Sequence, residues 1–257
     1  VLFIGDIVGR PGRIAVKNLL PKLKEEYRLE LIIANAENAA GGNGITRQIA
    51  NDLYDYGVDF LTMGNHVWDK KDILEFIDFE KRIIRPANFP KSTPGKGYSI
   101  IKKNDVEIGI MNLQGRVFMQ PIDCPFRAAD FLIDKIKLHT DLIIVDFHAE
   151  ATSEKVAMGW YLDGRVSAVI GTHTHIQTAD ERILPQGTAY ITDVGMTGPS
   201  ESILGVKKEN IITRFLTQMP NRFEVATEIP QLNAIILELN KNNGKTKKIK
   251  RIYQKYQ

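Results

Sequence analysis

Short runs of β-branched and aliphatic residues alternate along the chain with stretches in which apolar residues recur every three or four positions. The short runs predict strands at residues 1–5, 31–34, 60–62, 98–101, 108–112, 142–146, 168–170 and 188–192, and nearer the C-terminus at 223–226, 234–239 and 247–253. The longer stretches predict helices at residues 13–27, 46–56, 70–79, 126–138, 153–159 and 208–218. This alternation of strands and helices is typical of α/β proteins.

The composition indicates one globular domain. Hydrophobic residues fill 43% of the 257 positions, enough for one large core, and no repeat or low-complexity linker divides the chain, so we expect a single domain over residues 1–257. The longest apolar runs, such as residues 142–145, are far shorter than the roughly 20 residues of a membrane span. No basic and apolar leader precedes the first predicted strand, and we therefore expect a cytoplasmic protein that does not enter a membrane.

The basic charge is concentrated near the C-terminus. The formal net charge is +3, yet residues 241–257 carry seven lysines and arginines and no acidic residue. Contact with RNA is one interpretation of such a segment. The favoured interpretation is an edge strand that lysines protect from aggregation, because apolar and polar residues alternate there around the turn sequence Asn242-Asn243-Gly244.

Polar residues that can bind a metal come shortly after several predicted strands. The carboxyl ends of parallel strands meet at one edge of a sheet, so these side chains are expected to converge there. They are Asp6, Glu37, Asn65, His66, His148, His173 and His175. Four of the five histidines belong to this set, and the fifth, His139, lies at the end of a predicted helix where no function need be assumed.

His173 and His175 form a closely spaced pair within this set. Residues two apart in an extended segment point to the same side, so both imidazoles can face one cavity. A surface loop is the alternative for such a pair taken alone, and a buried core histidine is the alternative for His148. Carboxylates, amides and imidazoles suit Mn, Fe or Zn better than an all-oxygen calcium site, and the single cysteine, Cys124, excludes a site of several thiolates.

The order of these residues resembles the motif series of the calcineurin-like metallophosphoesterases. The series consists here of Gly5-Asp6, Glu37, Gly64-Asn65-His66, His148 and Gly171-Thr172-His173-Thr174-His175. Four strings, at residues 5–10, 36–38, 146–155 and 192–199, resemble more narrowly the YmdB-like branch of bacterial phosphodiesterases. The resemblance implies a four-layer α/β/β/α sandwich of two mixed sheets, with metals at the strand ends.

The resemblance also implies two metal ions. One would be bound by Asp6, Glu37, Asn38 and His175, and the other by Glu37, Asn65, His148 and His173. Glu37 would bridge the ions, and His66 would be the general acid that protonates the leaving alkoxide. Fe and Mn are the favoured metals, with Zn or Mg left open, because Val8 and Glu37 stand where the superfamily usually has a histidine and an aspartate.

Three weaker candidates lie near these motifs. Arg10 is a candidate for pairing with a phosphate oxygen, although an ordinary surface role is favoured. Thr192 and Asp193 are candidates for hydrogen bonding a ligating histidine, and a turn before the next glycine explains Asp193 equally well. Two residues separate His66 from Asp69, which leaves open whether Asp69 orients His66.

The predicted function is hydrolysis of a small phosphate ester. A hydroxide between two ions about 3.5–4 Å apart would attack phosphorus. The resemblance favours a phosphodiesterase acting on a cyclic nucleotide such as 2′,3′-cyclic AMP. The alternatives are a phosphomonoesterase or a nuclease on the same core, and a regulatory protein that binds RNA or a protein partner with little catalysis. We also expect a homo-oligomer.

Overall fold

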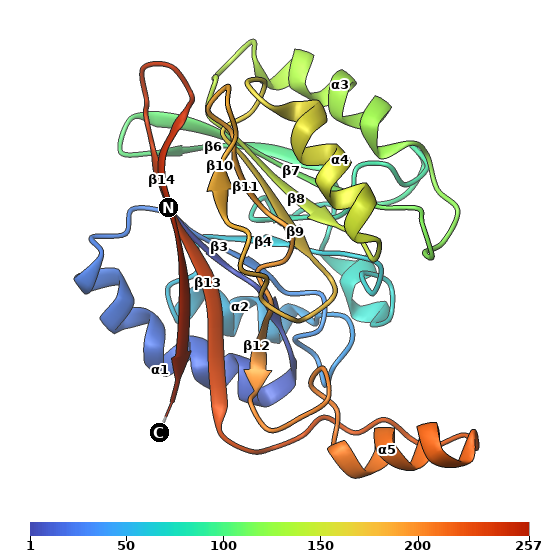
Figure 1. Cartoon of the computed structure of the whole chain (residues 1–257). Helices are drawn as coiled ribbons and strands as arrows, with labels where there is room; N and C mark the ends of the chain where they lie inside the picture. The colour runs from blue at the N-terminus through green and yellow to red at the C-terminus, as the bar shows by residue number, and fades with distance from the viewer. Residues whose placement is uncertain (257) are drawn as a thin grey trace.

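Two β-sheets lie face to face with helices on their outer faces in the computed structural model, which describes residues 1–256 (Figure 1). Both sheets contain parallel and antiparallel strand pairs. The architecture is therefore the predicted α/β/β/α sandwich. Within residues 1–256, no helix is both long enough and apolar enough to cross a bilayer.

The first sheet has eight strands in the order β2-β12-β13-β1-β3-β4-β5, with β14 paired to β13. The pairs β1–β3, β3–β4 and β4–β5 are parallel, whereas β13 is antiparallel to its neighbours. The bounds are β1 (Leu2–Ile4), β2 (Asp6–Ile7), β3 (Ile32–Asn35), β4 (Phe60–Thr62), β5 (Ile83–Ile84), β12 (Met196–Pro199), β13 (Pro230–Leu239) and β14 (Thr246–Lys255).

The second sheet has six strands in the order β10-β11-β9-β8-β7-β6. Its four inner strands are parallel, and the two edge strands are antiparallel to their neighbours. The bounds are β6 (Tyr98–Lys103), β7 (Val106–Gln114), β8 (Ile143–His148), β9 (Ala168–Thr172), β10 (Arg182–Ile183) and β11 (Ala189–Ile191). In both sheets the parallel strands end at one edge, and side chains that follow them can meet there.

Each sheet has its own cover of helices. The first sheet is covered by α1 (Gly9–Glu26), α2 (Arg47–Asp55) and the 3₁₀ helix η1 (Lys71–Glu75), and the second by α3 (Pro125–Ile136) and α4 (Thr152–Leu162). Helix α1 is amphipathic and buries Val16, Leu20 and Leu23 against the first sheet. The last helix, α5 (Lys208–Thr217), projects from the sandwich (Figure 1).

The core has three apolar layers because alternate strand residues point to opposite faces of each sheet. In β1, Leu2 and Ile4 pack toward the helices, whereas Phe3 packs between the sheets. In β8, Ile144 lies between the sheets and Val145 points to the helices of the other side. Burying each such side chain contributes about 1.5–3 kcal/mol, so the inner strands are rigid supports for the loops at their ends.

Several predicted elements differ from the observed ones. Residues 223–226 form no strand, and only Val225 makes an isolated bridge, because Phe223 and Glu224 are exposed and only Ala226 at the end of the segment is buried. Residues 70–79 contain the 3₁₀ helix η1 rather than an α-helix. The short strands β2, β5, β10 and β12 were not predicted, since two to four residues are too few to show a period.

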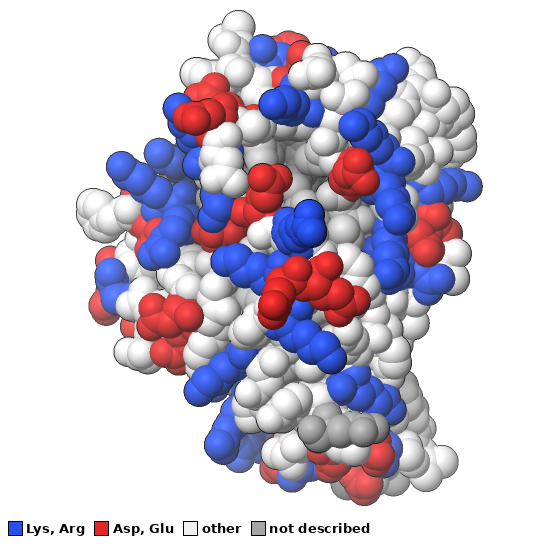
Figure 2. All heavy atoms as spheres, turned by 90° about the vertical axis from the view of Figure 1, so that its left-hand side faces the viewer, with Lys and Arg blue, Asp and Glu red and all other residues white. Residues whose placement is uncertain are grey.

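The basic C-terminal segment is an edge strand, as favoured. Within residues 1–256, strand β14 pairs only with β13, and residues 242–244 form the turn between them. Lys247, Lys248 and Lys250 are exposed, and lysine and arginine side chains gather on this face among scattered acidic ones (Figure 2). Such lysines discourage pairing with a further strand. Contact of this face with RNA stays a prediction.

Candidate metal centre

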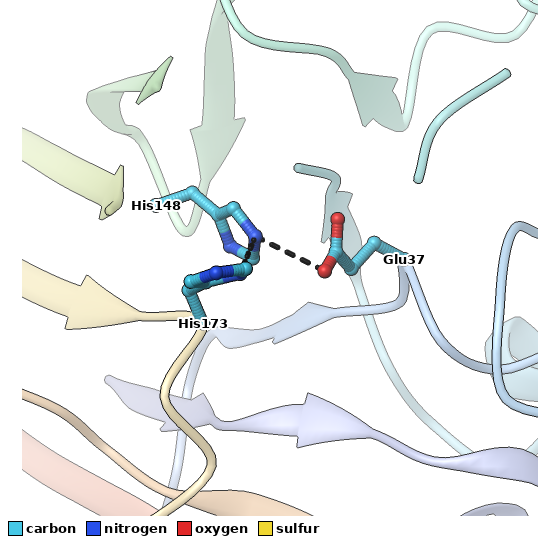
Figure 3. Close-up of side chains that lie close together, drawn as sticks. All are labelled: Glu37, His148 and His173. Carbon is cyan, nitrogen blue, oxygen red and sulfur yellow. Dashed lines mark hydrogen bonds and ion pairs between the residues drawn. The ribbon is translucent and has the colours of Figure 1, made fainter. Parts of the chain in front are cut away.

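The candidate ligands converge on the carboxyl edges of both sheets. Asp6 begins β2, Glu37 and Asn38 follow β3, Asn65 and His66 follow β4, His148 ends β8, and His173 and His175 follow β9. Glu37, His148 and His173 form a cluster in which one ligand atom of each lies within 4.8 Å of the others. In Figure 3 these three side chains point toward one another from different strands.

The ring of His148 is the centre of this cluster. Its Nε2 lies 3.0 Å from Oε1 of Glu37, 3.0 Å from Oδ1 of Asn65 and 3.0 Å from Nδ1 of His173. A ring nitrogen has one proton or one lone pair and cannot satisfy three such atoms. Ligands held at 2.0–2.2 Å by one metal ion lie about 3 Å apart, so the spacing fits a metal at this point.

A buried hydrogen-bond chain fixes the orientation of His148. Its Nδ1 lies 2.9 Å from the hydroxyl of Thr172, which in turn donates to Asp146 at 2.7 Å. Since the hydroxyl proton is directed to Asp146, the oxygen of Thr172 accepts from Nδ1–H of His148, and Nε2 is left to face the cluster. Thr62 also donates to Asp146, at 2.5 Å. This hydrogen-bond chain was not predicted from the sequence, although a lone aspartate inside the apolar run of residues 142–147 was its signal.

The electrostatics of Glu37 and His148 are coupled. Burial alone would raise the pKa of Glu37, but the charge and hydrogen bond of His148, together with His66, lower it to about 2. Burial alone would lower the pKa of His148, but Glu37, Asp6 and Asp146 raise it to about 9. A cation that binds at Nε2 must displace that proton, and the same carboxylates would attract it.

Asp6 has an unusual environment for a carboxylate. The side chain is fully buried, and among residues 1–256 its Oδ1 has no hydrogen-bond partner, while Oδ2 accepts from the backbone N–H of His173 at 3.3 Å. Burial raises the pKa of this carboxyl, although His175 and His148 oppose the shift. Because a buried unpaired carboxylate oxygen is costly, a metal ligand role explains Oδ1 well.

His175 and Asn38 lie beside Asp6 but pack less tightly than the cluster. Nδ1 of His175 donates to the carbonyl of Leu204 at 3.1 Å, and Nε2 lies 3.3 Å from Oδ1 of Asn38. The backbone contact fixes the ring and turns Nε2 inward. Neither Asp6 nor His175 belongs to the 4.8 Å cluster, so the structure gathers the ligands implied for one metal more closely than those implied for the other.

The segment that carries His173 and His175 is not extended. The φ angles of these residues are 99° and 66°, in the left-handed region that side chains disfavour. Both imidazoles nevertheless line one cavity, as predicted. Asp193 holds Thr174 between them and so fixes the shape of the loop. The carboxylate of Asp193 accepts from N–H and Oγ1 of Thr174 at 3.0 and 2.7 Å.

His66 lies at the mouth of the site, and Asp69 does contact it. Nδ1 of His66 is 2.8 Å from Oδ2 of Asp69, while the backbone N–H of His66 donates to Glu37 at 3.0 Å. The intervening residues form a turn, since N–H of Asp69 bonds the carbonyl of His66. The side chain of His66 is 37% exposed, so its other nitrogen is open to a bound molecule.

The weaker candidates have other contacts. Thr192 donates to Asp180 at 2.5 Å, and Asp193 bonds Thr174 and the N–H of Gly195; among residues 1–256, neither side chain bonds a histidine ring. The contact of Asp193 with the N–H of Gly195 is the turn that the sequence offered as the alternative, and a supporting role of Thr192 and Asp193 for a ligating histidine stays a prediction. Arg10 is exposed and does not line the cavity.

A cavity of about 250 Å³ opens over the cluster, and its wall includes one residue that the sequence analysis missed, Glu150. Oε2 of Glu150 lies 3.1 Å from Nε2 of His173. A larger cavity, of about 660 Å³, lies between the sheets near Leu31, Ile108 and Leu142. No His, Asp and Glu cluster of metal-binding geometry lines that one within residues 1–256, so the smaller cavity is the candidate for chemistry.

Comparisons with known proteins agree with this geometry. The family model described as YmdB-like protein matches residues 2–252. A Bacillus subtilis protein named 2′,3′-cyclic-nucleotide 2′-phosphodiesterase is 55% identical over 252 residues, which cover 98% of this chain and 96% of that protein. The crystal structure of a hypothetical protein from Thermus thermophilus has a TM-score of 0.93 at 42% identity and covers 99% of this chain and 98% of its own. That of a novel phosphatase from Mycoplasma pneumoniae has a TM-score of 0.93 at 40% identity, with coverage of 99% and 92%.

Proposed function

Since this chain belongs to the YmdB-like family, we propose that it is a dinuclear-metal phosphodiesterase that hydrolyses 2′,3′-cyclic nucleotides. By homology it is a hydrolase of the phosphatase and phosphodiesterase class. The observation that carries the metal-dependent part is the environment of His148, where three ligand atoms lie 3.0 Å from one ring nitrogen. The unpaired oxygen of Asp6 supports it.

The proposed ligands divide into two groups that share Glu37. Asp6, Glu37, Asn38 and His175 would hold one ion, and Glu37, Asn65, His148 and His173 the other. The bridging role of Glu37 is supported by its burial and by the different partners of its two oxygens, His148 at Oε1 and the N–H of His66 at Oε2. When bound, two ions supply positive charge that polarises the phosphate and activates water. The donor set of carboxylate, amide and imidazole suits Fe or Mn, with Zn or Mg as alternatives.

The proposed general acid is His66. Asp69 occupies its Nδ1, so Nε2 is the nitrogen that can exchange a proton with a leaving oxygen. In a 2′,3′-cyclic nucleotide, attack of water on phosphorus breaks the bond to O2′, and O2′ takes up a proton as it leaves. The product of that cleavage is a nucleoside 3′-phosphate. The burial of Glu37, 1% exposed, supports a role in metal binding rather than in proton transfer to solvent.

The test combines elemental analysis with hydrolysis of 2′,3′-cyclic AMP and bis-p-nitrophenyl phosphate after loading with Mn or Fe. About two metals per chain and formation of 3′-AMP are expected for the wild type. Glu37→Gln is expected to lose the metal and hydrolysis of both esters, whereas His66→Ala should keep the metal and lose hydrolysis of 2′,3′-cyclic AMP. A wild type that binds no transition metal, or variants as active as it, would contradict the proposal.

The expected homo-oligomer, the cytoplasmic location and the single domain over residues 1–257 stay predictions.

The alternative to an enzyme is a regulatory protein that binds RNA or a protein partner and has little catalytic activity. RNA binding through β14 would weaken steeply as salt rises, because phosphate contacts release counterions. Hydrolysis of a small diester should instead follow the metal supply and His66, so the two activities can be separated in one titration.

A further inference from the structure

The wall of the cavity over the metal centre has an uneven charge. It is lined by Glu37, Asn38, His66, Glu150, His173, Thr174, His175 and Leu204. This lining, taken over residues 1–256, includes two carboxylates and no lysine or arginine. Glu37 is buried beneath the cavity, whereas the side chain of Glu150 is 47% exposed. Glu150 is therefore the carboxylate that a bound molecule would meet.

Among residues 1–256, no lysine or arginine lines the cavity beside Glu150. Lys155 is buried and pairs with Asp193 at 2.6 Å. Arg10 and Arg116 are exposed and lie outside the lining. Nε2 of His173 lies 3.1 Å from Oε2 of Glu150, and this contact holds the carboxylate on the cavity wall. The charge of Glu150 thus acts on whatever binds above the cluster.

Phosphate monoesters and diesters differ in charge, and the carboxylate of Glu150 repels them to different extents. A diester carries one negative charge at neutral pH, whereas a monoester carries about 1.5 to 2, because its second pKa is near 6. Two like charges within about 6 Å of each other at a partly buried site repel by enough to change an equilibrium about tenfold or more. The proposed metal ions would attract both esters, whereas the additional charge of a monoester also meets the carboxylate of Glu150, which no lysine or arginine of the described lining offsets.

We infer that Glu150 makes this site select phosphate diesters over monoesters, by placing a fixed negative charge on the cavity wall beside His173. The inference rests on the proposed function and narrows its substrate class. It also accounts for release of the product, since a nucleoside 3′-phosphate is a monoester and is repelled where its cyclic precursor is accepted.

The contact of Glu150 with His173 allows charge to be separated from position. A glutamine at 150 keeps an oxygen that can accept from Nε2–H of His173 but carries no charge. Glu150→Ala removes both the charge and the acceptor, and Glu150→Asp keeps the charge. Glu75→Gln is the matched control, because Glu75 is exposed and does not line the cavity, so it changes only the net charge.

The experiment compares kcat/KM for p-nitrophenyl phosphate and bis-p-nitrophenyl phosphate, and inhibition by 3′-AMP, with the Mn-loaded full chain. In Glu150→Gln the preference for the diester should fall about tenfold and 3′-AMP should inhibit more strongly, with metal content unchanged. Glu150→Asp and Glu75→Gln should keep the wild-type ratio.

An unchanged ratio in Glu150→Gln overturns the inference. So does a Glu150→Ala variant that loses metal and both activities while Glu150→Gln behaves as the wild type, because Glu150 would then only position His173. A metal-loaded wild type that hydrolyses neither ester overturns the proposed function itself, and with it the inference. If the wild type is active but Glu150→Gln keeps its ratio, only the inference about Glu150 fails. If the wild type is inactive, the proposed function fails.

Discussion

Lys155 and Asp193 form an ion pair, with Nζ and Oδ2 2.6 Å apart, in which both side chains are almost completely buried. Lys155 lies in α4, and Asp193 holds Thr174 between the two left-handed histidines. The pair therefore joins a helix of the outer layer to the loop that carries two proposed ligands.

Breaking this pair should be costly. Lys155→Met leaves the charge of Asp193 buried without a partner, and the free energy of unfolding should fall by about 3–5 kcal/mol. The matched control is Lys103→Met, since Lys103 pairs with Asp59 at the same 2.6 Å but is 37% exposed, and its loss should cost about 1 kcal/mol or less. Chemical denaturation of both variants measures the difference. Equal losses would show that the burial of the Lys155 pair has no energetic consequence.

Gly64 has no room for a side chain. A Cβ there would collide with the carboxylate of Glu37 and the imidazole of His148. Gly64→Ala should therefore abolish metal binding, measured by elemental analysis, and hydrolysis with it. Gly57→Ala is the control: its φ of 102° is strained for alanine, but its nearest contact is 3.8 Å away. It should lose about 1 kcal/mol of stability and keep the metal. Full metal content in Gly64→Ala would contradict the packing around Glu37.

The hydroxyl of Thr172 should matter for metal affinity beyond its effect on stability. Thr172→Val removes the hydroxyl that accepts from Nδ1 of His148. Loss of a hydrogen bond that orients a metal ligand should weaken Mn binding roughly 10- to 100-fold. Thr246→Val removes another buried hydroxyl, which donates to Ser167 at 2.7 Å. Thr246→Val should lose about 1 kcal/mol of stability, and Thr172→Val about 1.5–3 kcal/mol because its hydroxyl also donates to the buried carboxylate of Asp146. Calorimetric titration with Mn distinguishes them, and the same affinity in both would leave the orientation of His148 without a role for Thr172.

Asp69 should act through His66 and therefore depend on the leaving group. Asp69→Asn weakens the contact that orients the ring, and His66→Ala removes the acid altogether. An alkoxide needs a proton to leave, whereas p-nitrophenolate does not, so hydrolysis of 2′,3′-cyclic AMP should fall about 10²- to 10⁴-fold in His66→Ala and bis-p-nitrophenyl phosphate much less. Asn43→Ala, which removes another partner of Asp69, should change neither rate strongly. A loss that is equal for both esters would argue against the general acid role.

The elements with long, regular patterns were predictable from the sequence. Strand β4 has the predicted bounds, and β8 ends only two residues beyond the prediction, because each buries a continuous apolar run. Local pattern could not predict β12, whose four residues pair with β2 and β13 from distant parts of the chain. Short strands of this kind depend on tertiary pairing rather than on their own periodicity.

The candidate site shows the same division between local motif and tertiary contact. The motif series named the residues around His148, but the support of His148 by Thr172 and Asp146 became visible only when β8 and β9 were paired. The contact between His66 and Asp69 depends on a turn. Their spacing in the sequence did not decide whether the two side chains meet. Glu150 has no distinctive spacing, and its position over the cavity follows from where β8 ends.

The four ligands proposed for the second ion come from opposite halves of the sandwich. Glu37 and Asn65 follow strands of the first sheet, whereas His148 and His173 belong to the second. An ion shared by them would act as a cross-link between segments that are far apart in the chain, and it would close a long loop between the two sheets. Metal supply would thus set the mechanical coupling of the two sheets as well as the chemistry between them.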